Sequence, residues 1–169
     1  LQSAPPSPTY PPASALAAMQ LRLPGLTLPD SRHLIPLEAC QILLDLDEDS
    51  ILSEIEKGGL GWAWDIRTPT AERREIRVWR ESLLARMSGG DDSGDAGLDQ
   101  VVESILPHRD LRLMELARWF ACSGSHVSNL IRDGCLTLAG GRPTHSSAAA
   151  VTRITRESAA HFLHGRRVA

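Results

Sequence analysis

Apolar residues in the last third of the chain recur at the three- and four-residue spacing of short amphipathic helices. This spacing predicts one buried face on each of two successive helices: Leu113, Leu116, Ala117 and Phe120 in the first, and Val127, Leu130 and Ile131 in the second. Ser123-Gly124-Ser125 interrupts the pattern, and serine side chains can accept hydrogen bonds from the free amides at a helix start. Gly134 follows the second helix and is typical of a helix end. The pattern therefore predicts a helix, a turn and a second helix.

A hairpin and a third helix are expected after these two. Short strand-like runs at residues 136–139 and 150–154 flank Gly140-Gly141-Arg142-Pro143, which forms a turn-rich tip. Thr155 is expected to cap a last helix from Arg156 to about His164.

The same order of elements is expected a second time, earlier in the chain. Three blocks match in order: residues 51–60 with 127–136 and 77–82 with 153–158 at an offset of 76, and residues 38–40 with 115–117 at an offset of 77. The change of offset predicts one added residue near Leu44. Three ordered blocks in register indicate an internal duplication. We call residues 34–87 the first copy and residues 110–169 the second copy.

The duplication divides the chain into four parts. Residues 1–33 form a proline-rich arm, with five prolines in the first twelve residues, and are expected to be extended or disordered. Residues 88–109 are expected to be a flexible acidic linker and connecting segment, because residues 88–97 contain no apolar residue beyond one alanine. The two copies are expected to be compact domains. In the first copy the corresponding elements are expected at residues 34–44, 49–57 and 80–87 for the helices and 61–67 and 74–78 for the hairpin strands.

Composition narrows the class of protein. The apolar stretches among the 169 residues fall far short of the ~20 residues that a membrane span needs. The three cysteines are an odd number at wide spacing, which favours reduced thiols and a cytoplasmic location over a disulfide framework. Only seven aromatic residues are present (four Trp, two Phe and one Tyr), too few for a stacking surface that binds single strands.

Charge is distributed unevenly along the chain. The formal net charge is −3, but residues 110–169 carry eight arginines against four carboxylates. Residues 34–87 carry seven basic and eleven acidic side chains, and the connecting segment is acidic as well. A basic second copy therefore follows an acidic first copy.

The ordered series of motifs resembles the excisionase-like and MerR-like winged helix-turn-helix family. Two stretches carry the resemblance: Ser123-Gly-Ser-His-Val-Ser-Asn-Leu-Ile-Arg-Asp-Gly-Cys-Leu136, and Arg153-Ile-Thr-Arg-Glu-Ser158. The resemblance covers residues 110–165 well and residues 34–87 more loosely. It implies a mainly α fold with small β-hairpin wings, present as two tandem winged helix-turn-helix domains. It also implies DNA binding, with the second helix in the major groove and the wing over the backbone or minor groove.

Candidate DNA contacts are expected on the face of the second helix that lies opposite its buried face, and on the wing. Asparagine can bond adenine, arginine can bond guanine or a phosphate, and serines near a helix start suit phosphates. The candidates in the second copy are Ser123, Ser125, His126, Asn129 and Arg132 on the second helix, Arg142 and Thr144 at the wing tip, and Arg153 and Arg156 beyond it.

The first copy departs from this pattern. Its expected second helix begins with Asp47-Glu48-Asp49 and continues with Glu54 and Glu56, and these carboxylates would repel phosphates. Its wing is basic, and the candidates there are Arg67, Arg73, Arg74 and Arg77. Trp62, Trp64 and Trp79 lie on or beside the wing strands and are expected to fill the core, although an exposed one would suit a protein partner.

The leading hypothesis is a sequence-specific double-stranded DNA-binding protein of excisionase or transcription-regulator type. It would position or bend DNA for recombination, transposition or partition, or control transcription, and it would be cytoplasmic and associated with the nucleoid. A recombinase, transposase or other protein could bind through the acidic first copy. The alternative is an adaptor, in which the first copy and the proline-rich arm hold a protein partner and DNA contact is secondary. We expect no enzyme, no cofactor, no metal site and no membrane partner.

Overall fold

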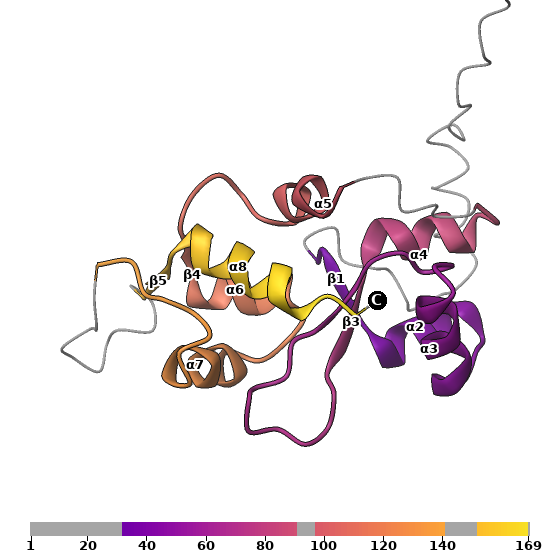
Figure 1. Ribbon diagram of the computed structural model, residues 1–169, viewed down its shortest axis with the longest axis horizontal. Helices are drawn as coiled ribbons and strands as arrows, with labels where there is room; N and C mark the ends of the chain where they lie inside the picture. The colour runs from indigo at the N-terminus through magenta and orange to yellow at the C-terminus, as the bar shows by residue number, and fades with distance from the viewer. Residues whose placement is uncertain (1–31, 91–96, 141–151, 169) are drawn as a thin grey trace, which may run out of the picture. The chain divides into compact units, whose positions relative to one another are not determined.

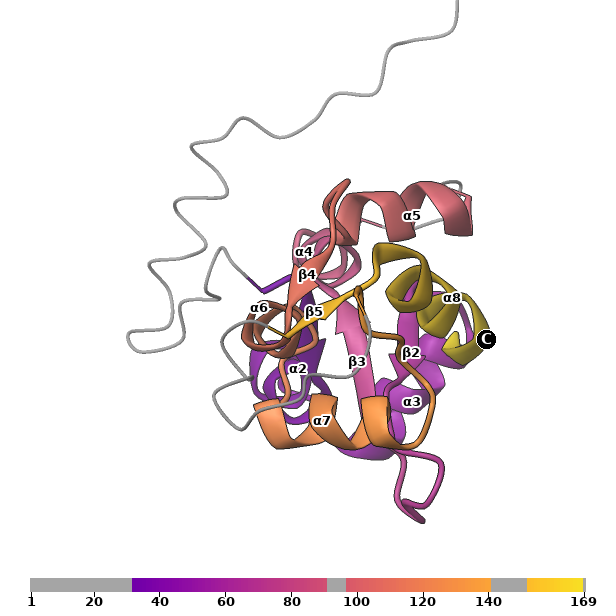
Figure 2. The same cartoon turned by 90° about the vertical axis from the view of Figure 1, so that its left-hand side faces the viewer.

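The first copy folds around a three-stranded antiparallel sheet. The structure is a computed structural model that describes residues 32–90, 97–140 and 152–168. The elements of the first copy are β1 (Leu34–Pro36), α2 (Leu37–Leu44), α3 (Glu48–Glu56), β2 (Ala63–Asp65), β3 (Ile76–Trp79) and α4 (Arg80–Met87). β3 lies between β1 and β2 in the sheet; β1 and β3 are labelled in Figure 1, and β2 and β3 in Figure 2. Residues 34–36 were expected to begin a helix, which is wrong: they pair with β3, and a local helical pattern carries no trace of pairing with a distant strand.

The second copy repeats this order of elements. It is preceded by α5 (Leu98–Ile105) and contains β4 (Leu111–Arg112), α6 (Leu113–Trp119), α7 (Gly124–Arg132), β5 (Arg153–Ile154) and α8 (Arg156–Arg166). β4 and β5 pair side by side (Figure 2), and Leu138 forms an isolated antiparallel bridge to Ile154. The expected wing tip at residues 141–151, with Arg142 and Thr144, lies outside the described residues.

Backbone details recur in the two copies at a constant separation of 76 residues. The equivalent pairs are left-handed Asp45 (φ 54°) and Ala121 (φ 49°), left-handed Gly58 (φ 80°) and Gly134 (φ 76°), and the helix caps Asp47 and Ser123. Strand pairing agrees, because Ile35 faces Val78 and Leu111 faces Ile154. The expected offset of 77 for residues 38–40 is therefore wrong, and no residue is added near Leu44.

One side of the first copy packs into the hydrophobic core of the second. Trp62, Trp64 and Ile66 of the first copy belong to the same buried cluster as Phe120 and Leu163 of the second. The burial of Trp62 and Trp64 confirms their expected place in the core. Residues 31–169 form one compact unit, whereas the sequence suggested two domains on either side of a flexible linker. The difference arises from apolar contacts between copies, which the pattern inside each copy does not reveal.

Part of the expected linker is folded into this unit. Val101, Val102 and Ile105 give α5 a buried face, and α5 packs against α8. The three residues follow the three- and four-residue spacing of an amphipathic helix. From Leu98 onward, the connecting segment is thus folded against the second copy.

The end of the second copy completes the sheet of the first. Arg167 forms an antiparallel bridge with Trp64 of β2, and the Val168 amide donates to the carbonyl oxygen of Ala63 at 2.9 Å. The Arg167 guanidinium carbon lies 4.0 Å from the centroid of the Trp62 ring, within the range of a cation–π contact. The last described residues therefore pair with the edge of β2 and tie the two copies together.

Helices make up most of the regular structure in the described ranges, with small antiparallel sheets, as the sequence pattern predicts. Within those ranges, no helix combines the length and the apolar character that crossing a membrane requires.

Candidate nucleic-acid interface

Helix α7 presents a polar face opposite its buried one. Val127 and Leu130 are buried, and the helix packs against α6. Of the candidate contacts on α7, Ser125 and Arg132 are exposed, and so is Ser128, which was not among the candidates. The Arg132 side chain is 69% exposed, with Nε 3.3 Å from the Asp133 carboxylate.

Two further candidates on α7 are less accessible. Asn129 is half-buried, so its amide contacts solvent only in part. Ser123 is exposed, but its hydroxyl caps the helix by accepting a hydrogen bond from the His126 amide at 3.1 Å. The hydroxyl can still donate outward, because a serine oxygen accepts and donates at the same time.

The equivalent helix of the first copy, α3, has the opposite character. At the constant separation of 76 residues, Ser125 corresponds to Asp49 and Arg132 to Glu56, and both carboxylates are exposed. Residues 124–132 of α7 contain no aspartate or glutamate. The duplicated helix is therefore acidic in one copy and free of acidic residues in the other.

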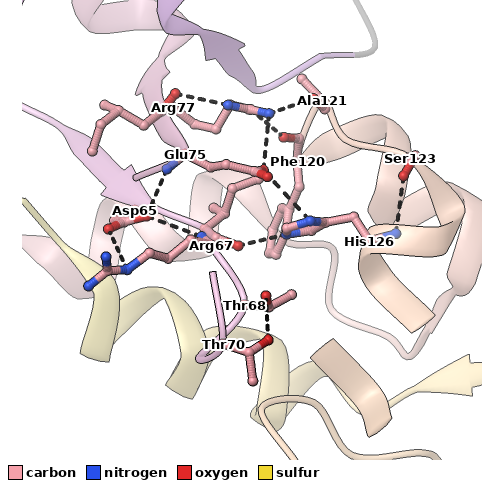
Figure 3. Close-up of polar contacts among 12 residues, drawn as sticks. Asp65, Arg67, Thr68, Thr70, Glu75, Arg77, Phe120, Ala121, Ser123 and His126 are labelled. Carbon is pink, nitrogen blue, oxygen red and sulfur yellow. Dashed lines mark hydrogen bonds and ion pairs between the residues drawn. The ribbon is translucent and has the colours of Figure 1, made fainter. Parts of the chain in front are cut away.

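His126 was expected to face outward, and this is wrong. Its side chain is 12% exposed, and its Nε2 lies 2.7 Å from the backbone carbonyl oxygen of Ile66 in the first copy (Figure 3). Because a carbonyl oxygen only accepts, Nε2 carries the proton. Nδ1 lies 3.6 Å from the carboxylate of Glu75. His126 therefore binds α7 to the hairpin of the first copy.

Arg77 was expected to reach DNA from the first wing, and it instead faces the second copy. Its Nε donates to the carbonyl oxygen of Phe120 at 3.2 Å, and its Nη2 donates to that of Ala121 at 3.3 Å (Figure 3). The side chain is 12% exposed and its Nη2 lies 3.7 Å from Glu75. These carbonyls end α6, where a cation satisfies acceptors that have no partner within the helix.

One carboxylate organises the remainder of the first hairpin. The Oδ1 atom of Asp65 accepts hydrogen bonds from the amides of Arg67 at 3.1 Å and Glu75 at 3.0 Å. The Arg67 guanidinium lies 3.3 Å from the same carboxylate and donates to the carbonyl oxygen of Glu72. Arg67 is thus engaged inside the hairpin. Arg73 and Arg74 are exposed, and Arg73 lies 3.8 Å from Glu48.

The two remaining arginines of the second copy differ from each other. Arg156 pairs with Glu103 of α5 and donates through Nε to the carbonyl oxygen of Pro107 at 3.0 Å. Its side chain therefore holds α5 and the following turn against the start of α8. Arg153 is exposed on β5, directly opposite Arg112 of β4.

Comparison with family models, with curated proteins and with solved structures finds no match to this chain.

Two of the three cysteines, Cys40 and Cys122, are not activated thiols. Burial raises the pKa of Cys40 and of Cys122 to about 12, so both stay protonated at neutral pH. Within the described ranges, no cluster of three or more histidine, cysteine or carboxylate side chains is arranged to hold a metal ion.

Sequence reasoning missed Asp65, Glu75 and Arg112. The first two act through backbone atoms and through the second copy, and no pattern within a single copy marks such contacts. Arg112 could be placed only once the strand pairing was known. At an offset of 76 it corresponds to Pro36, and because Pro36 faces Arg77, Arg112 faces Arg153.

Proposed function

We propose that the chain is a double-stranded DNA-binding protein that uses α7 as its reading helix. The observation that carries the proposal is the contrast between α7 and α3, which occupy equivalent places in the repeat. α7 exposes hydroxyl and guanidinium groups, with a half-buried amide beside them, and has no carboxylate among residues 124–132. These are the groups that bond base edges and phosphates, whereas the carboxylates on α3 would repel the backbone.

The second element of the proposal is the rigid placement of α7. His126 fixes the first turns of α7 to the first hairpin, and Arg77 fixes the end of α6 just before the turn. A reading helix that is already in place loses little conformational entropy on binding. In this proposal the first copy holds α7 of the second copy in a fixed orientation, and α3 does not enter a groove of the DNA.

The charge of the sequence that follows α7 favours the same class of partner. Residues 134–156 contain three arginines and no aspartate or glutamate, although one of them, Arg156, pairs with Glu103. A stretch of this length without a carboxylate suits a polyanion, because phosphate contacts supply most of the affinity for DNA. The assignment to an excisionase or to a transcription regulator rests on the resemblance of the motifs and is part of the proposal.

The test compares two equivalent positions. The full chain is titrated onto a fluorescent random-sequence duplex by anisotropy at several salt concentrations. Arg132→Ala removes the exposed cation from α7, and Glu56→Ala is its matched control on α3. We expect Arg132→Ala to weaken binding and to reduce the salt slope by about one unit, while Glu56→Ala leaves binding equal or slightly tighter. Equal weakening by both variants, or no binding by the unmodified chain, would overturn the proposal.

A second candidate function, the adaptor, is favoured by a different surface. A groove of about 400 Å³ lies between α2, α3 and the first hairpin. Its charged lining mixes three carboxylates with three arginines: Glu38, Glu48, Glu75, Arg73, Arg74 and Arg77. The carboxylates in this groove suit a protein segment better than DNA. If the unmodified chain does not bind duplex DNA at low salt, the adaptor becomes the favoured function.

A further inference from the structure

Two arginines face each other across the small sheet of the second copy. Arg112 of β4 and Arg153 of β5 are directly opposite in the antiparallel pairing. Their neighbours Leu111 and Ile154 are fully buried, so the two arginines lie on the outer face of the sheet, and both are exposed. Like charges directly opposite each other on a sheet destabilise it. The arrangement therefore requires a reason other than stability.

The first copy shows what this position does when it has a structural role. Arg77 is the equivalent of Arg153, and the residue opposite Arg77 is Pro36. Arg77 is largely buried, donates to two carbonyl oxygens at the end of α6 and lies near Glu75. In the described part of the chain, Arg153 makes no corresponding hydrogen bond or ion pair. Its opposite residue is a second cation instead of a neutral proline.

Nearby carboxylates are engaged elsewhere. Glu115 accepts from the backbone amide of Arg112 at 3.3 Å, and its carboxylate pairs with Arg109. Asp110 accepts from the backbone amide of Arg156 at 3.3 Å. The charge of Arg112 helps to lower the pKa of Glu115, but the hydrogen-bonded partner of that carboxylate is Arg109. Within the described ranges, no carboxylate forms a hydrogen bond or ion pair with the guanidinium of Arg112 or of Arg153.

We propose that Arg112 and Arg153 together form a binding site for one phosphate group. Two guanidinium groups side by side offer several N–H donors in planar forks, a geometry that matches the oxygens of a phosphate. The proposal rests on the proposed function in one respect, because it takes the phosphate from the backbone of duplex DNA. The pair therefore positions the second copy on DNA and carries no information about base sequence.

The experiment on DNA uses the full chain, both single alanine variants and the double variant. Salt titrations on a random-sequence duplex should show each single variant weakened by about fivefold to tenfold. The double variant should be little weaker than either single variant, because all three lose the same phosphate. For the same reason its salt slope should fall by about one unit and not by two. Lys57→Ala, which removes an exposed cation from the acidic first copy, is the control and should change neither quantity.

A second arm separates this site from the proposed function. The melting temperature is measured in inorganic phosphate and in chloride at equal ionic strength. Phosphate should raise the melting temperature of the unmodified chain and have a smaller effect on the double variant. If the unmodified chain fails to bind duplex DNA but shows this difference, the phosphate site stands and the proposed function falls. Unchanged DNA affinity and slope in the double variant, a slope reduced by two units, or an equal phosphate effect on both proteins would each overturn the site.

Discussion

The Nε2 atom of His126 lies 2.7 Å from the backbone carbonyl oxygen of Ile66, although the two residues are 60 positions apart in the chain. His126 is in the first turn of α7, and Ile66 follows β2 in the first hairpin. This hydrogen bond joins the exposed helix of one copy to the hairpin of the other. Under the proposed function, this hydrogen bond gives the acidic first copy a role that does not require DNA contact, because it fixes the orientation of α7.

Replacement of His126 should loosen this junction. His126→Ala leaves the Ile66 carbonyl oxygen without its partner in a partly buried place, and we expect the free energy of unfolding to fall by about 1–3 kcal/mol. His126→Gln can restore an N–H donor and should recover part of the loss. Urea denaturation measures the effect, with Ser125→Ala on the exposed face of α7 as the control. If the free energy of unfolding falls no more for His126→Ala than for the control, His126 does not stabilise the contact between the two copies.

Arg77 and Arg153 occupy equivalent positions and should respond differently to the same change. Arg77→Ala removes two donors from the end of α6, so we expect a loss of about 2 kcal/mol in the free energy of unfolding. Arg153→Ala removes an exposed cation that faces another cation, and at low salt it should leave stability unchanged or slightly raised. Thermal melts of both variants in low and high salt provide the measurement. Equal destabilisation would show that Arg153 has a structural partner after all.

The shared core predicts cooperative unfolding. Because Trp62 and Trp64 belong to the same cluster as Phe120 and Leu163, unfolding of either copy exposes apolar side chains of the other. Calorimetry of the full chain should therefore show one transition, with equal calorimetric and van't Hoff enthalpies. Two separated transitions, each matching an isolated copy, would restore the two-domain arrangement.

The start of α6 should make stability sensitive to acid. The hydrogen bond from Arg109 lowers the pKa of Glu115 below its ordinary value of 4.5, and the backbone amide of Arg112 adds to this. A carboxyl group with a depressed pKa in the folded state stabilises the fold above its ordinary pKa. The stabilisation is lost as the pH falls through the folded pKa. Glu115→Gln should therefore lower the melting temperature at pH 7, and the difference from the unmodified chain should shrink below pH 4.5. A difference that does not depend on pH would contradict this assignment.

Local features of the fold could be predicted from the sequence because they depend on neighbouring residues. Ser123 caps α7 and Thr155 caps α8, as expected from their hydroxyl groups at the start of apolar patterns. Gly134 ends α7 in the left-handed conformation, which glycine adopts without steric cost. These confirm predictions made from a few consecutive residues.

Contacts between the copies could not be predicted in this way. The spacing of apolar residues within the second copy assigns His126 to the exposed face of α7. The first hairpin covers this side chain, and nothing in the second copy indicates that contact. Arg77 looked like a wing cation for the same reason. In both cases the partner is a backbone carbonyl oxygen, which every residue possesses and which therefore leaves no signature in the sequence.

The most direct test of the central claim is the effect of Asn129→Ala on sequence discrimination. A preferred duplex is first selected with the unmodified chain, and both proteins are then titrated onto that duplex and onto a random one. If α7 reads base edges, Asn129→Ala should cost about 1–3 kcal/mol on the preferred duplex and leave binding to the random duplex nearly unchanged. Equal losses on both duplexes, or no loss on either, would show that α7 does not read DNA.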